Sequence, residues 1–343
     1  MRPANDGAII ARVVNVLVTG ASGFLGQRLV ESLLADGSVV TSGGEEVAIE
    51  TLRACDVVAP PTAFADDERL EMVIGDFTAP GAIGDLVDDR TAAVFHLAAV
   101  VSGEAQRDFE LGMRVNFDAS RHLLEACRHR ASRPRLVFAS SVAVYGGALP
   151  EVVDESVPLD PQSSYGAQKS MTELLVAEYT RRDFIDGRSL RLPTIVVRSG
   201  KPNAAASTFA SSILRDPLQG RETVCPVSEE AGVWLLSPRR VTEAFCHAAR
   251  LSHDDWGGRR AVCLPGMTVT VREMLAALGE VAGAAAVDRV RFAPDPFIES
   301  LVAGWPVRFS TEAAEKLGFR RDDSMRSVIE AFIEDHPEGV LIP

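Results

Sequence analysis

The first half of the chain alternates short apolar runs with stretches in which apolar residues recur at helical spacing. The helix expected over residues 24–35 carries Leu25, Leu29 and Leu33 on one face. Longer helices are expected over residues 108–130 and 165–182. Strands are expected at residues 13–18, 49–55, 70–74, 93–98, 135–139 and 190–197. Strands and helices in alternation predict an α/β fold, with a doubly wound parallel sheet covered on both faces.

The pattern changes after Arg198. Residues 199–233 are rich in Gly, Pro, Ser and Ala and show little periodicity, which is typical of a loop-and-helix segment beside a ligand site. A strand at residues 262–264 is expected to return to the main sheet. Helices at residues 270–282 and 311–317 are expected in a smaller C-terminal lobe.

Composition narrows the class of protein. The 343 residues include 35 Lys and Arg against 48 Asp and Glu, and the net charge of −13 argues against a nucleic-acid or anionic-membrane partner. A hydrophobic content of 46% indicates an ordinary globular core. The first twelve residues lack a cationic start followed by a continuous apolar run. We therefore expect no signal peptide and no membrane span, and a cytoplasmic location.

Cysteine and histidine give no sign of a metal site. The five cysteines are scattered without a CxxC pair, and the six histidines show neither HxxxH nor HxH spacing. An odd number of cysteines without metal-ligand spacing favours free thiols in a reducing compartment. We therefore predict no bound metal.

Tyr165 and Lys169 form the most informative pair in the chain. Four residues apart on a helix, their side chains lie on one face, so the ammonium can stabilise the phenolate. Lowering a phenol pKa of about 10 by about 3 units takes about 4 kcal/mol of differential interaction. Because the chain has only three tyrosines and three lysines, chance produces this spacing in about 3% of such chains. The pair predicts an acid–base site, and a helix-surface pair without a role is the alternative.

A glycine-rich turn at residues 19–26, Thr-Gly-Ala-Ser-Gly-Phe-Leu-Gly, joins the first expected strand to the first expected helix. Gly20 permits a tight turn, Gly23 lets the backbone approach a pyrophosphate, and Gly26 allows close packing of helix on strand. Backbone N–H groups at the helix N-terminus would then meet the phosphates. This position in the chain indicates a dinucleotide site, and a glycine turn without a ligand is the alternative.

Two acids follow the next strands. Asp56 ends the second expected strand, where a carboxylate can accept hydrogen bonds from the adenosine ribose and repel a 2′-phosphate, which favours NAD. It lies later than usual after Gly26, which an insertion at residues 37–46 explains, and the nearby Arg53 keeps NADP open. A surface aspartate at a strand end is the alternative. Asp76 follows the third expected strand and can bind the adenine amino group.

Together these motifs resemble the extended short-chain dehydrogenase/reductase superfamily, the NAD-dependent epimerases and dehydratases. The matching segments are residues 19–26, 75–76, 96–99, 116, 140–146, 165–169 and 193–195. The resemblance implies a Rossmann-type NAD-binding domain over residues 1–197. It implies a mainly substrate-binding lobe over residues 198–343, with a segment near 234–266 returning to the Rossmann domain. It also implies a homodimer that pairs through the helices at 108–130 and 165–182.

The resemblance also implies the role of each site residue. Tyr165 would be the general acid/base, Ser141 would hold the reacting oxygen, and Lys169 would bind the nicotinamide ribose and lower the tyrosine pKa. Asn116 would support the active-site geometry. The implied contacts with NAD are Gly20, Ser22, Gly23, Phe24, Leu25, Gly26, Asp56, Asp76, Phe77, Leu97, Ala98, Ala99, Asn116, Tyr165, Lys169, Pro193 and Ile195.

Two segments distinguish among the members of the superfamily. Residues 233–238, Val-Trp-Leu-Leu-Ser-Pro, lack the Arg-Asp-aromatic-aliphatic-His element usual in nucleotide-sugar enzymes. Residues 198–207 instead resemble the D-erythronate dehydrogenase subgroup. This implies NAD-dependent oxidation of a four-carbon sugar acid at its C2 hydroxyl, from D-erythronate to 2-dehydro-D-erythronate. A UDP-sugar epimerase or dehydratase with bound NAD, and a non-catalytic NAD-sensing protein, remain the alternatives.

A small sugar acid needs charged hydrogen-bond donors for its carboxylate, and this protein is acidic overall. Arg198 and Lys201 follow the sixth expected strand, at the edge of the sheet where ligands bind. The expected substrate contacts are Ser141, Tyr165, Arg198, Lys201, Asn203 and Ser207. A structural ion pair for Arg198 and a solvated Lys201 are the alternatives.

Overall fold

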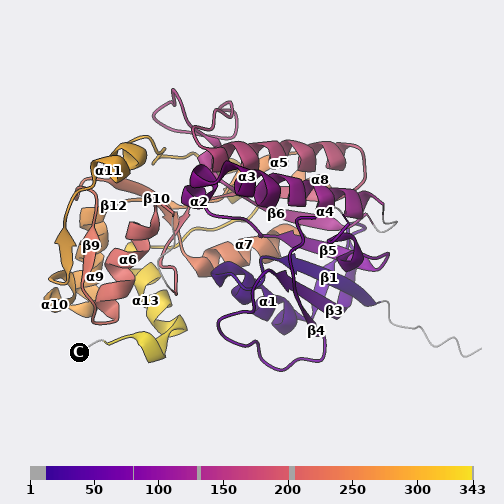
Figure 1. Cartoon of the computed structure of the whole chain (residues 1–343), viewed down its shortest axis with the longest axis horizontal. Helices are drawn as coiled ribbons and strands as arrows, with labels where there is room; N and C mark the ends of the chain where they lie inside the picture. Colours follow the sequence, from indigo (N-terminus) through magenta and orange to yellow (C-terminus); the bar gives the residue numbers. More distant parts are fainter. Residues whose placement is uncertain (1–12, 80, 130–132, 201–204, 342–343) are drawn as a thin grey trace, which may run out of the picture.

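The computed structural model describes residues 13–79, 81–129, 133–200 and 205–341, which form two lobes (Figure 1). The elements of the first 200 residues are β1 (Val13–Thr19), α1 (Phe24–Asp36), β2 (Ser38–Val40), β3 (Glu46–Asp56), β4 (Leu70–Ile74), β5 (Thr91–His96), α2 (Ser102–Arg107), α3 (Phe109–Gly112), α4 (Ala119–Arg128), β6 (Arg135–Ser141), α5 (Ser164–Arg181), β7 (Asp186–Leu192) and β8 (Thr194–Ile195). Those that follow are α6 (Thr208–Leu218), β9 (Thr223–Cys225), β10 (Gly232–Leu236), α7 (Pro238–Arg250), α8 (His253–Trp256), β11 (Ala261–Cys263), β12 (Met267–Thr270), α9 (Val271–Ala282), α10 (Ala284–Val287), β13 (Val290–Phe292), α11 (Pro296–Ala303), α12 (Glu312–Lys316) and α13 (Met325–Asp335).

The main sheet has the strand order β11-β7-β6-β5-β1-β3-β2, and β4 also pairs with β3. All of its pairings are parallel except that of β2 with β3. The strand order reverses at β1, which lies between β3 and β5, so the loops after β1 and β5 diverge at this point. Ligands bind at such a switch point in doubly wound sheets. The structure confirms the predicted α/β fold.

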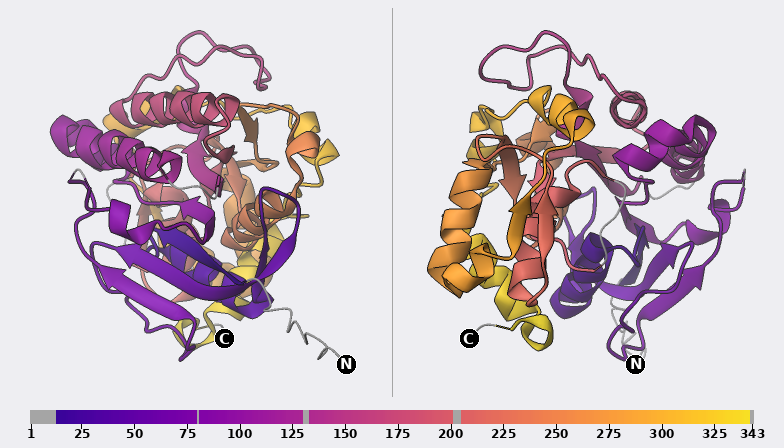
Figure 2. Two further views of the ribbon diagram at one scale, coloured as in Figure 1. Left: turned by 90° about the vertical axis from the view of Figure 1, so that its right-hand side faces the viewer. Right: turned by 60° about the vertical axis from the view of Figure 1, so that its left-hand side comes forward.

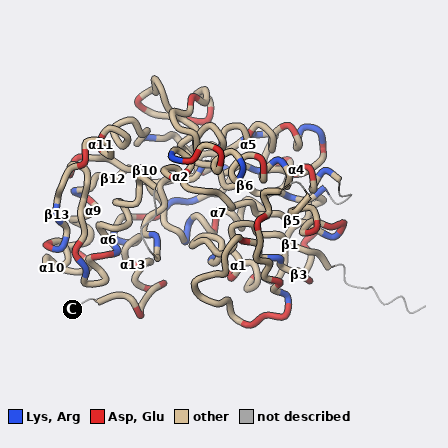
Figure 3. Tube along the Cα trace, in the orientation of Figure 1, with Lys and Arg blue, Asp and Glu red and all other residues tan. Residues whose placement is uncertain are grey.

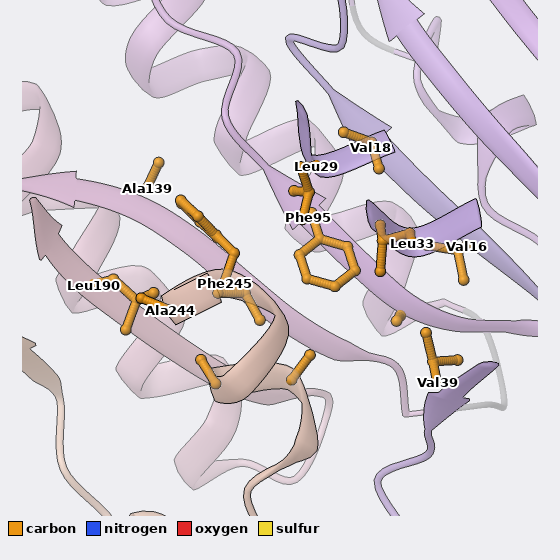
Figure 4. Packing of buried hydrophobic residues seen from close by; sticks show 14 of the residues in the cluster. Val16, Val18, Leu29, Leu33, Val39, Phe95, Ala139, Leu190, Ala244 and Phe245 are labelled. Atoms are coloured by element: carbon orange, nitrogen blue, oxygen red, sulfur yellow. The ribbon is translucent and has the colours of Figure 1, made fainter. Parts of the chain in front are cut away.

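Helices cover both faces of this sheet, as neighbouring residues of β5 show. Phe95 packs in one core cluster with Leu29 of α1 and Phe245 of α7, as Figure 4 shows. Val94 points to the opposite face, where its cluster includes Leu123 of α4 and other residues of α4 and α5. Because β5 is buried along its whole length, its sequence is almost continuously apolar instead of alternating.

The sixth expected strand, over residues 190–197, is wrong in its extent. β7 begins at Asp186, because Asp186 and Arg188 are buried in the sheet as an ion pair of 3.2 Å that a hydrophobic pattern does not detect. Pro193 then interrupts the strand, since proline has no N–H to donate to a ladder. The following β8 pairs with β10 in a separate sheet.

The helix expected over residues 108–130 is also less regular than predicted. It begins as α3, continues as a π-helical stretch over Met113–Asp118, and resumes as α4. Asn116 lies in the π-helical stretch, a type of distortion that often occurs at functional sites. By contrast, α5 runs over Ser164–Arg181, close to the predicted 165–182.

The C-terminal lobe has its own core. A three-stranded sheet, β12-β10-β8, and a two-stranded sheet, β13-β9, pack with α6, α9 and α13 around Ile213, Leu278 and Ile329. Figure 2 (right) shows the strands of this lobe lying between its orange outer helices and the purple sheet lobe. Acidic and basic positions are intermingled over both lobes (Figure 3).

The division of the chain near residue 197 stays a prediction. The core of the main sheet includes Val262 of β11, which pairs with β7, and residues of α7. It also includes Ala314 of α12. The helix expected over residues 311–317 was assigned to the C-terminal lobe, and this is wrong because α12 packs against β11.

Candidate active site

The glycine turn after β1 is built as a dinucleotide site requires. Gly20 has a φ of +74°, and its N–H and that of Ala21 donate to the carbonyl of Cys55 at the end of β3, at 2.9 and 3.1 Å. A Cβ on Gly20 would lie 2.7 Å from the Ala98 nitrogen, and one on Gly26 would lie 2.1 Å from the Gly20 oxygen. Helix α1 begins without a side-chain cap, so its N-terminus can face an anion. These features fit the pyrophosphate of a nicotinamide dinucleotide.

Asp56 lies beside this turn, at the end of β3. Its Oδ2 accepts the Ser22 N–H at 2.9 Å and its Oδ1 accepts the Val57 N–H at 2.7 Å. Arg53 points elsewhere, because its guanidinium binds Glu71 at 3.0 Å and Asp88 at 2.8 Å. The arginine that could have served a 2′-phosphate is thus held by two acids away from Asp56.

The residues expected to contact adenine, and those that follow β5, lie at the same edge of the main sheet as the glycine turn. Asp76 follows β4, and its Oδ1 accepts the Thr78 N–H at 2.9 Å, which lowers the pKa of its carboxyl. Phe77 packs partly buried below Gly75. Residues 97–99 follow β5, directly behind the glycine turn.

His96 is a buried core residue. Its Nδ1 is hydrogen-bonded to Thr19 Oγ1 at 2.7 Å and its Nε2 to Ser120 Oγ at 2.8 Å. Burial lowers its pKa to about 3, helped by the nearby charge of Lys169. A neutral ring with both nitrogens bonded has no proton to exchange with a substrate.

Ser141 and Tyr165 meet where β6 ends and α5 begins. The Ser163 hydroxyl caps α5 by accepting a hydrogen bond from the Gly166 N–H at 3.1 Å. Gly166 packs closely on Ala143, because a Cβ added to Gly166 would lie 2.1 Å from the Ala143 carbonyl oxygen. This close approach brings Tyr165 to Ser141, and the Ser141 side chain lowers the pKa of the Tyr165 phenol. The sequence placed these two residues 24 positions apart, and the fold brings them together.

Lys169 is buried on the same face of α5. Its Nζ donates to the carbonyl of Ala139 at 2.8 Å and lies 4.8 Å from the centroid of the Phe138 ring. It lies 5.6 Å from the centroid of the Tyr165 ring. Burial lowers its pKa to about 7, which the charge of Glu173 partly opposes. The ammonium is therefore held beneath the tyrosine by the end of β6.

The electrostatics of Tyr165 differ from those expected. Burial raises its pKa to about 12, and the side chain of Ser141 and the charge of Arg198 oppose the rise. Lys169 had been expected to lower this pKa, but in this structure the cation that does so is Arg198. From the sequence, Arg198 was expected to contact the substrate, with a structural ion pair as the alternative.

Asn116 connects three segments around the site. Its Oδ1 accepts the Val100 N–H at 2.8 Å, and its Nδ2 donates to Gln168 Oε1 at 2.8 Å. Gln168 precedes Lys169 on α5, so Asn116 fixes the helix that carries the tyrosine and lysine. On the other side of the site, Pro193 and Ile195 mark the passage from β7 to β8.

A cavity of about 200 Å³ lies between the glycine turn and the start of α6. Arg198 lines it and binds Ser207 Oγ at 3.2 Å. The expected substrate residues Lys201 and Asn203 lie outside the described residues. The cavity is lined by Ser22, Phe24, Gln27, Pro61, Arg198, Ser199, Gly200, Thr208, Ser211 and Arg215. Arg215 was missed by sequence analysis, because a helical arginine in a segment without clear periodicity gives no signal of its own.

A buried network that we call the Tyr145 network lies behind the site and was also missed. It consists of Ser140, Tyr145, Glu173, Arg191 and Cys263. Glu173 binds Arg191 at 2.7 and 2.9 Å and accepts the Ser140 hydroxyl at 2.5 Å. Glu173 follows Lys169 by four residues, a spacing that could have revealed it.

The chain belongs to the NAD dependent epimerase/dehydratase family, whose model matches residues 16–237. This confirms the resemblance found in the sequence and implies a nicotinamide cofactor. Within the described residues, no helix is both long and apolar enough to cross a bilayer. In the described part of the chain, the five cysteines form no disulfide.

Two relatives match over nearly their full length. A D-erythronate dehydrogenase from Cupriavidus necator is 52% identical, over 94% of this chain and 98% of that protein. A D-erythronate dehydrogenase from Haemophilus influenzae is 44% identical, over 94% of this chain and 99% of that protein. The crystal structure of a nucleoside-diphosphate-sugar epimerase from Agrobacterium tumefaciens is similar, with a TM-score of 0.88 at 40% identity and 95% coverage of both chains.

Proposed function

We propose that this protein is an NAD-dependent dehydrogenase that oxidises the C2 hydroxyl of D-erythronate to give 2-dehydro-D-erythronate. The observation that carries the proposal is the full-length identity of 52% and 44% to two D-erythronate dehydrogenases. The proximity of Ser141 to Tyr165, whose pKa it lowers, supports the reaction chemistry at the edge of the sheet that holds the glycine turn.

Tyr165 acts as the general base and takes the proton of the C2 hydroxyl. Ser141 donates its hydroxyl to the same oxygen as it becomes a carbonyl. Arg198 stabilises the tyrosine anion, because its charge lowers the pKa of Tyr165. Lys169 would hold the nicotinamide ribose. The chemistry that a bound nicotinamide would supply is acceptance of the hydride from C2.

The substrate carboxylate is one bond away from the carbon that is oxidised, so its binding group must lie beside Tyr165. Arg198 meets this requirement, since its charge acts on Tyr165 and its guanidinium is held by Ser207. Carboxylate recognition by an arginine fork is strong and directional. Within the described residues we therefore propose Arg198 and Ser207 as contacts of the substrate carboxylate, in addition to Ser141 and Tyr165 at the C2 oxygen.

The choice of NAD over NADP rests on Asp56 beside the glycine turn and on the ion pairs of Arg53 with Glu71 and Asp88.

We further propose a cytoplasmic homodimer that pairs through α3, α4 and α5. Phe109 of α3 is 57% exposed and Leu174 of α5 is 53% exposed, and a second copy of the chain would cover both.

The test is NADH formation by the purified protein with NAD and each of D-erythronate, L-threonate, D-threonate and L-erythronate. Steady NADH formation selective for D-erythronate is the expected result. No NADH with any of the four acids would reject the sugar-acid proposal. UDP-sugars and analysis of bound cofactor would then test an epimerase, and NAD binding without turnover of any substrate would indicate a sensing protein.

A further inference from the structure

The cavity at the glycine turn has one wall from each lobe. Ser22, Phe24 and Gln27 contribute the wall on the side of the sheet, at the start of α1. Thr208, Ser211 and Arg215 contribute the opposite wall, from α6. A group held by the glycine turn therefore faces α6 across this cavity.

Arg215 is the buried cation of the α6 wall. It is 2% exposed, and its side chain is fixed by three bonds: Nε to Asp216 Oδ1 at 2.9 Å, Nη1 to the Arg198 carbonyl at 3.1 Å, and Nη2 to Ser212 Oγ at 3.0 Å. A guanidinium has five N–H donors. The described residues take three of them, so two can serve a ligand in the cavity.

We assign the carboxylate of the sugar acid to Arg198 and not to Arg215. Arg198 lines the cavity and its charge acts on Tyr165. The hydrogen bonds of Arg215 go to Asp216, Arg198 and Ser212, and within the described residues none goes to Tyr165 or Ser141. The residues that line the cavity include three from the glycine turn and the start of α1, where a dinucleotide places its phosphates.

We propose that Arg215 binds the pyrophosphate of the dinucleotide from the side opposite the glycine turn, so that the cofactor bridges the two lobes. The positive charge of Arg215 compensates the phosphate charge in a protein with a net charge of −13. Its bond to the Arg198 carbonyl couples the phosphate site to the residue that acts on Tyr165. This inference rests on the nicotinamide dinucleotide of the proposed function and not on the identity of the sugar acid.

The test measures binding without a sugar acid, so it stands whether or not D-erythronate is oxidised. Dissociation constants of NADH and ADP-ribose, which contain the pyrophosphate, are compared with that of adenosine, which lacks it. The variants are Arg215→Met and the milder Arg215→Gln, which keeps an amide donor. Arg221→Gln is the matched control, because Arg221 binds the same Asp216 at 2.8 Å but its side chain is 58% exposed and does not line the cavity.

Loss of a charged hydrogen bond should weaken NADH and ADP-ribose by about 10- to 100-fold in both Arg215 variants. Adenosine binding, and all binding by Arg221→Gln, should change by less than about two-fold. If Arg215→Met fails to fold, Arg215→Gln decides the question alone. An equal loss for adenosine and ADP-ribose would show a merely structural role and overturn the proposal. Unchanged NADH affinity in the folded variants would also overturn it.

Discussion

Tyr145 and Tyr165 lie in two neighbouring regions of the same lobe, but their hydroxyl groups have different partners. The Tyr145 hydroxyl receives a hydrogen bond from Arg191 at 2.5 Å, donates to the Asp154 carbonyl at 2.9 Å and lies 3.3 Å from Cys263 Sγ. The Tyr165 hydroxyl has Ser141 as its partner and the charge of Arg198 nearby. Burial raises the pKa of both phenols, that of Tyr145 well above its usual range and that of Tyr165 to about 12.

The difference lies in how each hydroxyl is satisfied. The chain itself supplies the partners of Tyr145, so this phenol contributes to stability and has no proton to exchange. Tyr165 instead lies near a cation, which can stabilise its phenolate, and near a serine, which can donate to the reacting oxygen of a substrate. Tyr145 is buried and Tyr165 is partly buried, and the two also differ in the partners of their hydroxyl groups.

The largest effect expected from this comparison is that of Tyr165→Phe on turnover. Removing the hydroxyl removes the general base, so kcat should fall by about a thousandfold while NADH affinity is largely retained. Tyr145→Phe is the matched control: it should lower the free energy of unfolding by about 1–3 kcal/mol and leave kcat of the folded enzyme within a few-fold. Steady-state kinetics and urea denaturation of both variants provide the measurements. Substantial turnover by Tyr165→Phe would remove the role assigned to it.

Glu173→Gln should produce the next largest effect, on stability. The variant leaves the buried Arg191 without its counter-charge, which should lower the free energy of unfolding by about 3–5 kcal/mol. Ser140→Ala is the control, because it removes one hydrogen bond to Glu173 and keeps the ion pair, so it should cost about 1 kcal/mol. Urea denaturation monitored by circular dichroism measures both. A Glu173→Gln protein as stable as the wild type would mean that the network does not stabilise the fold.

Local motifs account for what the sequence could predict. The glycine turn and the Tyr165–Lys169 pair depend on residues a few positions apart, so their spacing carries the geometry. The α/β pattern was visible wherever strands are apolar. It failed at β7, whose first residues are polar but buried, and no hydrophobic pattern signals a strand stabilised by ion pairs.

The remaining features depend on packing between distant segments. Arg191 meets Tyr145 across 46 positions, and Arg215 faces the glycine turn from a different lobe. The cation that acts on Tyr165 proved to be Arg198, 33 positions away, because the fold directs Lys169 to the Ala139 carbonyl. Such contacts depend on the tertiary arrangement, which a single sequence does not specify at the level of side chains.

The smallest expected effect is a change of the free energy of unfolding with pH, which the buried Lys169 causes. Its folded pKa is lowered to about 7 from an ordinary value of 10.5, because burial disfavours the ammonium. Between these values the unfolded chain binds a proton that the folded chain does not. The free energy of unfolding should therefore gain about 1 kcal/mol per pH unit from this lysine as pH rises above 7. Denaturation at pH 7, 8 and 9 measures this slope.

Lys169→Met should abolish this contribution, whereas Lys316→Met should keep it, because Lys316 is exposed beside Glu312. Glu173 connects this slope to the Tyr145 network, because its charge opposes the lowering of the Lys169 pKa. In Glu173→Gln the rise should accordingly begin at a lower pH. Parallel slopes in wild type and Lys169→Met would show that the lysine remains charged in the folded protein. The Tyr165 region would then hold a permanent cation, as the Tyr145 network does with Arg191.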